Sequence, residues 1–289
     1  MKYAGPMLLL CCLMPLSGCA VGSFVSSFLF TPDLSGNWEV ASQTGATTGT
    51  PPTAGLLLVG SLTSQGSNVS GIFRLANLSL PNTCGIPLQQ VVTVSGSIDF
   101  SRNLTLKSVP FGGSTLSMQF VVPPALTVVG SGASLTGLTG TIAITGGTCT
   151  FASSTAFGAE IVPVTGIFAG PLTANPYLTT PPIAAGTATL ALTQAAIPQS
   201  DGQFPVTGTL RFSGGGCASS TPLTGTVSGT QLTLVSAPTG LFGTSTDTLA
   251  AIVNLATGQL NVASLIYGLG PCHTAITSIT QFTGNLTKQ

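Results

Sequence analysis

The side chains that could perform acid–base or nucleophilic chemistry are few in this chain, and its one histidine is the natural starting point. His273 directly follows Cys272. A hydrolase built on His273 would need a carboxylate such as Asp201 or Asp247 to orient the imidazole, and a serine or threonine as the nucleophile. These groups are scattered along the sequence, and neither a Gly-x-Ser-x-Gly nor a His-Glu-x-x-His pattern occurs. We therefore expect no enzyme and no catalytic residue, with His273 a loop residue.

The seven cysteines separate by position into a leader pair, a single residue and a widely spaced set. Zinc sites made of four thiolates use close Cys-x-x-Cys pairs, which the widely spaced set lacks. Without the leader pair and Cys19, four cysteines remain. If the leader exports the chain, as its motif described below implies, an even number of cysteines favours disulfides instead. We expect no metal and no other cofactor, and two disulfides among Cys84, Cys149, Cys217 and Cys272.

The charge content excludes another class of function. Six basic and six acidic side chains make up only 4% of the chain, against roughly a quarter in an average soluble domain. No cluster of basic residues is available to neutralise phosphates, so nucleic acid is not an expected partner. At 43% hydrophobic residues, the chain has enough apolar side chains to build a core.

The leader carries a motif with a chemical consequence. Lys2 precedes a short apolar stretch that ends in Leu16-Ser17-Gly18-Cys19. This segment resembles the lipobox of bacterial lipoproteins. The resemblance implies that residues 1–18 are a signal peptide, that Cys19 becomes the lipidated amino terminus, and that residues 19–33 form a tether. Ala20 is not the aspartate that retains lipoproteins in the inner membrane of enterobacteria, so the outer membrane is favoured. A membrane anchored through acyl chains, palmitate among them, is thus the one partner we expect.

The body of the chain is predicted to be all-β. Short runs rich in Val, Ile, Leu and Thr alternate between apolar and hydroxyl side chains, and Gly, Asn and Pro separate them. This pattern is typical of antiparallel strands with one buried face. We expect eight strands in a first unit, near 36–42, 56–64, 69–76, 90–100, 103–109, 115–122, 139–145 and 161–172. We expect seven in a second, near 187–194, 205–213, 223–229, 231–236, 247–255, 259–267 and 276–287.

The two halves of the chain repeat one another. Residues 69–75 match residues 206–212, residues 104–110 match residues 232–238, and cysteines follow at corresponding places. Residues 165–168 and 283–286 are interpreted as matching closing strands. The prediction is therefore two tandem antiparallel meander units, β-barrel-like or alternatively sandwiches, at 34–173 and 186–289, with residues 174–185 as a Pro-rich linker.

The meander order predicts how the cysteines pair. Cys84 follows the third strand of the first unit and Cys149 the seventh, so both leave the unit at the same end. The second unit separates Cys217 from Cys272 by the same number of strands. We expect one disulfide within each unit.

Three residues are candidates for binding a ligand. Arg74 and Arg211 occupy matching places in the repeat, where each either solvates an outer strand face or points into a barrel to hold an anion. Trp38 lies in a Gly-x-Trp sequence that resembles the opening strand of calycin-type barrels, the lipocalins and avidins. That resemblance implies a barrel that begins at Trp38, although the arginine that packs on this tryptophan in lipocalins has no counterpart in residues 161–173.

These observations favour a non-catalytic, membrane-anchored envelope lipoprotein that acts as a structural, adhesive or interaction module. The alternative is a carrier of a small apolar ligand inside a barrel. A hydrolase is the third hypothesis. The volume inside the barrels discriminates the first two, because a carrier needs a cavity and a module does not.

Overall fold

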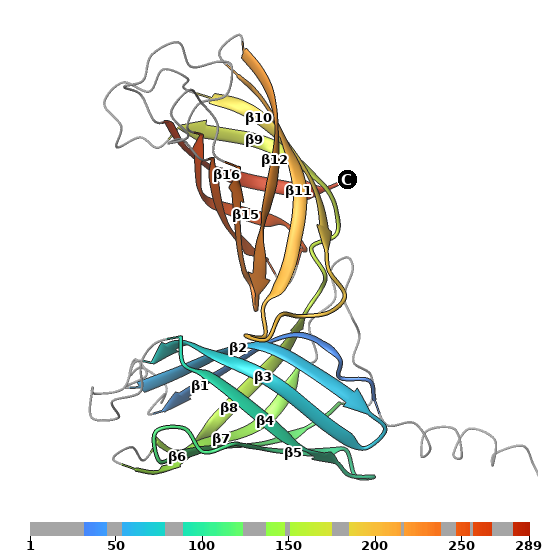
Figure 1. Ribbon diagram of the computed structural model, residues 1–289, viewed down its shortest axis with the longest axis vertical. Coiled ribbons are helices and arrows are strands. Elements are labelled where there is room, and N and C mark those ends of the chain that lie inside the picture. Colours follow the sequence, from blue (N-terminus) through green and yellow to red (C-terminus); the bar gives the residue numbers. More distant parts are fainter. Residues whose placement is uncertain are drawn as a thin grey trace, which may run out of the picture. The chain divides into compact units, whose positions relative to one another are not determined.

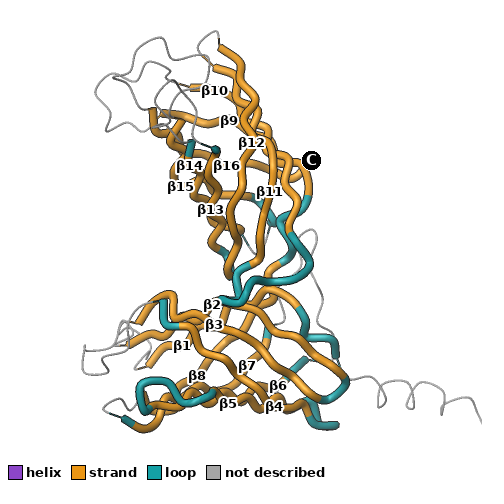
Figure 2. The backbone as a smooth tube through the Cα atoms, viewed as in Figure 1, coloured by secondary structure: helices purple, strands orange, loops and turns teal. Residues whose placement is uncertain are grey.

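The computed structural model describes residues 32–44, 54–78, 89–123, 137–147, 151–174, 185–214, 217–237, 247–254, 257–267 and 280–289. By its contacts the chain divides into residues 1–32 and residues 33–289. The second of these contains the strands, which Figures 1 and 2 show.

Residues 36–161 form a closed, eight-stranded antiparallel barrel in which each strand pairs with the next and β1 closes on β8. The strands are β1 (Gly36–Thr44), β2 (Ala54–Gln65), β3 (Asn68–Leu78), β4 (Val91–Ile98), β5 (Asn103–Ser108), β6 (Ser114–Val121), β7 (Leu138–Gly146) and β8 (Phe151–Ile161). The prediction of an all-β meander barrel is confirmed, and the sandwich alternative is not observed.

Residues 166–288 form a second closed barrel with the same meander order, in which β9 pairs with both β10 and β16. Its strands are β9 (Gly166–Ala174), β10 (Ala185–Gln194), β11 (Phe204–Gly214), β12 (Cys217–Ser228), β13 (Gln231–Ser236), β14 (Thr248–Val253), β15 (Leu260–Tyr267) and β16 (Thr280–Lys288).

The boundary between the barrels differs from the predicted one. The strand expected near 161–172 to close the first unit is β9, the opening strand of the second barrel. Strand β8, which the sequence analysis missed, closes the first barrel. Residues 162–165 join the two barrels, whereas the predicted linker 174–185 connects β9 to β10 inside the second barrel. The expected match between the segments at 165–168 and 283–286 is therefore wrong, because they belong to the first and last strands of one barrel.

Alternation along the strands produces the two cores. In β5 and β13 the leucines and a terminal serine are buried while the intervening residues are exposed. Two separate clusters of buried hydrophobic side chains result, one for each barrel, and every member is at most 5% exposed. Eight strands give a barrel just wide enough for side chains to fill it.

The repeat is visible in hydrogen bonds as well as in sequence. In the first barrel, Leu34 N donates to Ser64 Oγ (2.9 Å) and Ser64 N donates to Ser35 Oγ (3.0 Å). In the second barrel, Val164 N donates to Gln194 Oε1 (3.0 Å), and Gln194 N donates to Thr165 Oγ1 (3.1 Å). In each barrel, the same pair of hydrogen bonds therefore joins the segment before the first strand to the end of the second strand.

Candidate functional site

The two arginines at matching places lie on the outer faces of β3 and β11, because the side chains flanking each of them are buried in the core. Those flanking residues are Phe73, Leu75, Leu210 and Phe212. The hypothesis that Arg74 and Arg211 point into the barrels and hold an anionic ligand is therefore wrong. Arg211 is exposed, as expected for a residue that solvates an outer face.

Arg74 has a different role from Arg211. Its Nη2 donates to Asp201 Oδ2 at 2.6 Å and its Nη1 donates to Gln89 Oε1 at 3.2 Å. Asp201 lies in the turn between β10 and β11, where Gly202 N donates to Gln199 O. The ion pair is only partly exposed, with side-chain values of 18% for the arginine and 33% for the aspartate. It connects the outer face of the first barrel to a turn of the second.

Hydrogen bonds explain the pKa of Asp201. Partial burial raises this pKa, but bonds from the Gln203 side chain and backbone, together with the charge of Arg74, outweigh burial and lower it. Asp99, in the turn between β4 and β5, accepts bonds from Asn103 N and Nδ2 (2.7 and 2.9 Å). Asp99 therefore closes the β4–β5 turn.

A second turn of the second barrel contacts the outer face of β1. Asn37 is 2% exposed. Its Nδ2 donates to Gly229 O (2.9 Å), and its Oδ1 accepts from Gly229 N (2.8 Å). Glu39 Oε2 accepts from Thr230 N (3.0 Å) and Thr230 Oγ1 (2.8 Å). We call this set of contacts, together with the Arg74–Asp201 ion pair, the joint.

Hydrophobic packing also takes part where the barrels meet. Ile161, the last residue of β8, is 1% exposed and belongs to the core cluster of the second barrel, as does Val164 after it. On β2, Val59 faces outward from the first core yet is only 3% exposed, and a Cβ added to Gly229 would lie 2.6 Å from Val59 Cγ1. The joint is therefore a buried interface rather than a pair of surface contacts.

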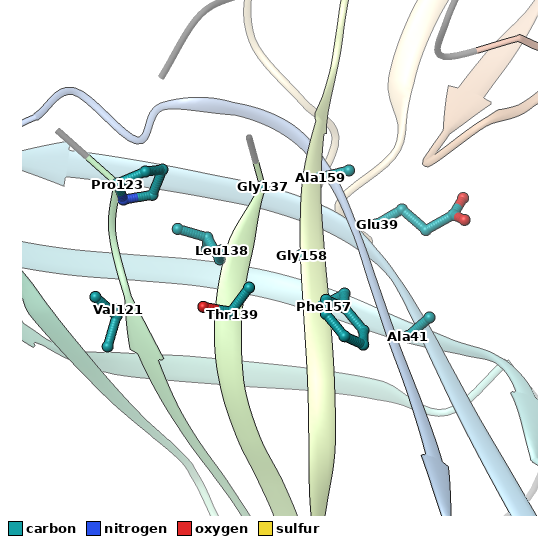
Figure 3. Close-up of a pocket in the computed structure, with 10 residues that line it drawn as sticks. All are labelled: Glu39, Ala41, Val121, Pro123, Gly137, Leu138, Thr139, Phe157, Gly158 and Ala159. Atoms are coloured by element: carbon teal, nitrogen blue, oxygen red, sulfur yellow. The ribbon is translucent and has the colours of Figure 1, made fainter. Parts of the chain in front are cut away.

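A pocket of about 660 Å³ lies on the first barrel, on the strands β1, β6, β7 and β8 (Figure 3). Its lining residues are Glu39, Ala41, Val121, Pro123, Gly137, Leu138, Thr139, Phe157, Gly158 and Ala159. The lining is thus almost entirely apolar.

The wall of this pocket carries large apolar groups exposed to solvent. Phe157 is 60% exposed and Val121 is 54% exposed, both on outer strand faces. Figure 3 shows the carboxylate of Glu39 directed away from Phe157 and Leu138, so the stem of Glu39 lies nearer to these apolar residues than its charge does. Such a surface is suited by its chemistry to an uncharged apolar group.

Trp38 is in β1, the first strand of the first barrel, as its resemblance to calycin barrels implies. Its side chain is fully buried, and its Nε1 donates to Leu34 O at 2.8 Å. In the second barrel, Phe168 on β9 occupies the place that corresponds to Trp38 and is 2% exposed. Trp38 is therefore a core residue and does not line the pocket.

Glu160 stands opposite Trp38 on β8. Burial, and secondarily the charge of Asp33, raises the pKa of Glu160.

Several predicted residues lie outside the described part of the chain. These are Cys19, Cys84, Cys149, Cys272 and His273. Cys217 begins β12. The other three body cysteines fall in the connections from β3 to β4, from β7 to β8 and from β15 to β16, and Cys217 directly follows the connection from β11 to β12. The strand count on which the disulfide prediction depends is therefore observed, and the pairing stays a prediction.

Within the described ranges, no three His, Cys, Asp or Glu side chains gather as a metal site would require. The same ranges hold no helix with the length and apolar character needed to cross a bilayer. No protein-family model, no curated protein and no solved structure matches this chain.

Sequence reasoning missed the residues that form the pocket and the joint. The one signal for Phe157 was its place among small residues, in a strand whose inward positions are Ala156, Gly158 and Glu160. Asn37 and Gly229 carried no signal, because an amide on an outer strand face and a glycine in a turn are ordinary features of β proteins.

Proposed function

We propose that this protein is a lipid-anchored interaction module of the bacterial cell envelope, with Cys19 as the lipidated residue and the outer membrane as the favoured location. Its pocket receives an apolar side chain of a partner protein. The proposal depends most on one observation: the pocket wall presents exposed Phe157 and Val121 on the outside of a barrel. Monomeric proteins keep large apolar groups exposed together mainly where something binds.

The close burial of the core side chains favours a module over a carrier. Carriers enclose most of the surface of their ligand in a cavity. The core side chains that the structure describes are at most 5% exposed in both barrels, which is the burial expected of a packed interior. The pocket is instead open along the outer strand faces, which suits a side chain that projects from another protein.

Three of the carboxylates that the structure describes favour binding over catalysis, because each is engaged within the protein. Asp201 is bound to Arg74, Asp99 closes a turn, and Glu39 accepts two bonds from Thr230. A general acid or base must be free to reach a substrate proton. These three groups are occupied in stabilising turns and the joint.

A photocrosslinking experiment tests the proposal. Thr139 is exposed and lines the pocket, so a benzoylphenylalanine placed there lies beside any bound partner. We expect one protein adduct in intact cells, which the neutral fluorophore N-phenyl-1-naphthylamine competes away and which Phe157→Ser abolishes.

The matched control is Ile252→Ser, which removes an exposed apolar side chain from the outer face of the second barrel. It should leave the adduct unchanged. Saturable binding of the fluorophore without any protein adduct would show a small-molecule carrier instead. An adduct that survives both the fluorophore and Phe157→Ser would contradict the assignment of the pocket.

A further inference from the structure

Glu39 belongs to the pocket and to the joint at once. Its side chain lines the pocket. Its Oε2 accepts both hydrogen bonds from Thr230, one from the backbone and one from the hydroxyl. Figure 3 shows the carboxylate turned away from Phe157, which leaves the stem of Glu39 against the apolar side. The second barrel therefore holds one wall residue of a pocket that lies on the first barrel.

The turn that holds Glu39 is itself fixed in place. The Asn37 side chain bonds both the N–H and the C=O of Gly229, and it is almost wholly buried. Gly229 has a φ of +54°, and a Cβ at this position would lie 2.6 Å from Val59 Cγ1 and 2.9 Å from Glu39 Oε2. Only a residue without a side chain lets the turn approach β1 and β2 this closely.

We propose that binding in the pocket and docking of the turn at Gly229 and Thr230 reinforce each other through Glu39. This rests on the proposed function of the pocket. When the turn is docked, two hydrogen bonds keep the carboxylate out of the pocket and present its methylenes to the ligand. When the turn is undocked, the carboxylate loses both donors and the stem is free to leave the wall. A ligand that contacts the ordered stem favours the docked state, and linkage requires that docking strengthen binding by the same factor.

Binding of N-phenyl-1-naphthylamine to the full chain, followed by fluorescence, tests the coupling. Asn37→Ala removes the bonds that fix the turn but no lining residue, and we expect it to weaken binding about fivefold. Thr230→Val deletes only the hydroxyl donor to Glu39, and we expect about twofold weaker binding. Thr233→Val, the same substitution at an exposed position of β13, should have no effect.

A second measurement tests the reverse effect, that of pocket binding on docking of the turn. Amide exchange at Gly229 and Thr230 should slow when the fluorophore is bound, because occupancy favours the docked turn. The fluorescence of Trp38, the single tryptophan of the chain, verifies that the first barrel is folded in each variant. If Asn37→Ala does not fold, the effect of Thr230→Val on binding tests the coupling.

The outcomes separate this inference from the proposal on which it rests. Absence of saturable binding to the unaltered chain, or binding that Phe157→Ser leaves intact, would overturn the pocket assignment and the coupling with it. Binding that requires Phe157 but is equal in the unaltered chain, Asn37→Ala and Thr230→Val would overturn the coupling alone. Unchanged exchange at the two amides on binding would do the same.

Discussion

Asn37 and Gly229 exchange a reciprocal pair of hydrogen bonds in which a side-chain amide takes the place of a peptide group. The two bonds, at 2.9 and 2.8 Å, join positions far apart in the sequence and satisfy the N–H and the C=O of the glycine. The arrangement imitates one rung of an antiparallel sheet, although the barrels share no strand pairing of their own there. Removing either partner leaves buried polar atoms without a bond, which is costly.

Gly229→Ala should destabilise the contact between the barrels more than a positive φ alone explains. The added Cβ would meet Val59 Cγ1 and Glu39 Oε2. Gly258→Ala is the matched control, because Gly258 has a φ of +64° with no atom within 4 Å of its Cβ position. We expect both variants to lose about 1 kcal/mol from the backbone conformation, and Gly229→Ala to lose about 1–3 kcal/mol more from overpacking. Urea unfolding measures both. Equal losses would mean that the Gly229 contact contributes nothing.

Arg74→Met should make the stability of the protein less dependent on pH in acid. The pKa of Asp201 is lowered in the folded state, so its stabilising contribution is present above the unfolded pKa of about 4 and is lost as pH falls through the folded pKa. Without Arg74 the pKa of Asp201 rises toward its usual value, and the loss at neutral pH should be at most about 1 kcal/mol because the pair is partly exposed.

Arg211→Met provides the comparison for this variant, since Arg211 stands at the matching place of the repeat and is exposed. Urea midpoints at several pH values between neutral and strongly acidic conditions measure the difference. A pH profile that shifts equally in both variants would show a general effect of net charge, not of the ion pair.

Cys19→Ala should block lipidation and release the protein from membranes. The prediction follows from Leu16-Ser17-Gly18-Cys19 and its place after the apolar stretch of the leader. Labelling with radioactive palmitate and fractionation of the membranes measure it, with Cys12→Ala as the control that keeps the lipobox. A Cys19→Ala chain that still incorporates palmitate would contradict the processing site.

Peptide mapping without reduction should find Cys84 joined to Cys149 and Cys217 joined to Cys272. In each barrel the two connections are separated by four strands of a meander, and alternating strand direction brings them to the same end. Cross-linking loops of this size stabilises a fold by about 4 kcal/mol in the chain-entropy model. Free thiols or a bond between Cys149 and Cys217 would refute the pairing.

Sequence alternation predicted most strands but failed at one, for a physical reason. In the second half of β8 the inward positions are Ala156, Gly158 and Glu160, while the large Phe157 faces outward. None of these three inward residues is a large apolar side chain, so this part of the strand carries little hydrophobic signal of its own. Missing β8 also caused the boundary error, because β9 was then needed to close the first barrel.

The candidate site was beyond the reach of sequence patterns for a related reason. Arg74 and Arg211 match in sequence and in strand position, yet only Arg74 meets an aspartate, because its partner comes from a turn of the other barrel. Local periodicity specifies which face of a strand is buried. It does not specify what covers the opposite face, and the pocket and the joint both lie there.

Because β1 pairs with β8 and β9 pairs with β16, each barrel closes on its own strands and forms one continuous cassette of the chain. In the first, Asn37 pairs with Ile161; in the second, Phe168 pairs with Lys288, so the chain enters and leaves each barrel at neighbouring positions of the same rim. A cassette of this kind can be copied in tandem without breaking any sheet, since only a short connection such as residues 162–165 is needed between copies. We expect each barrel also to tolerate circular permutation, with new termini opened at a turn and the old ones fused, because its first and last strands are neighbours.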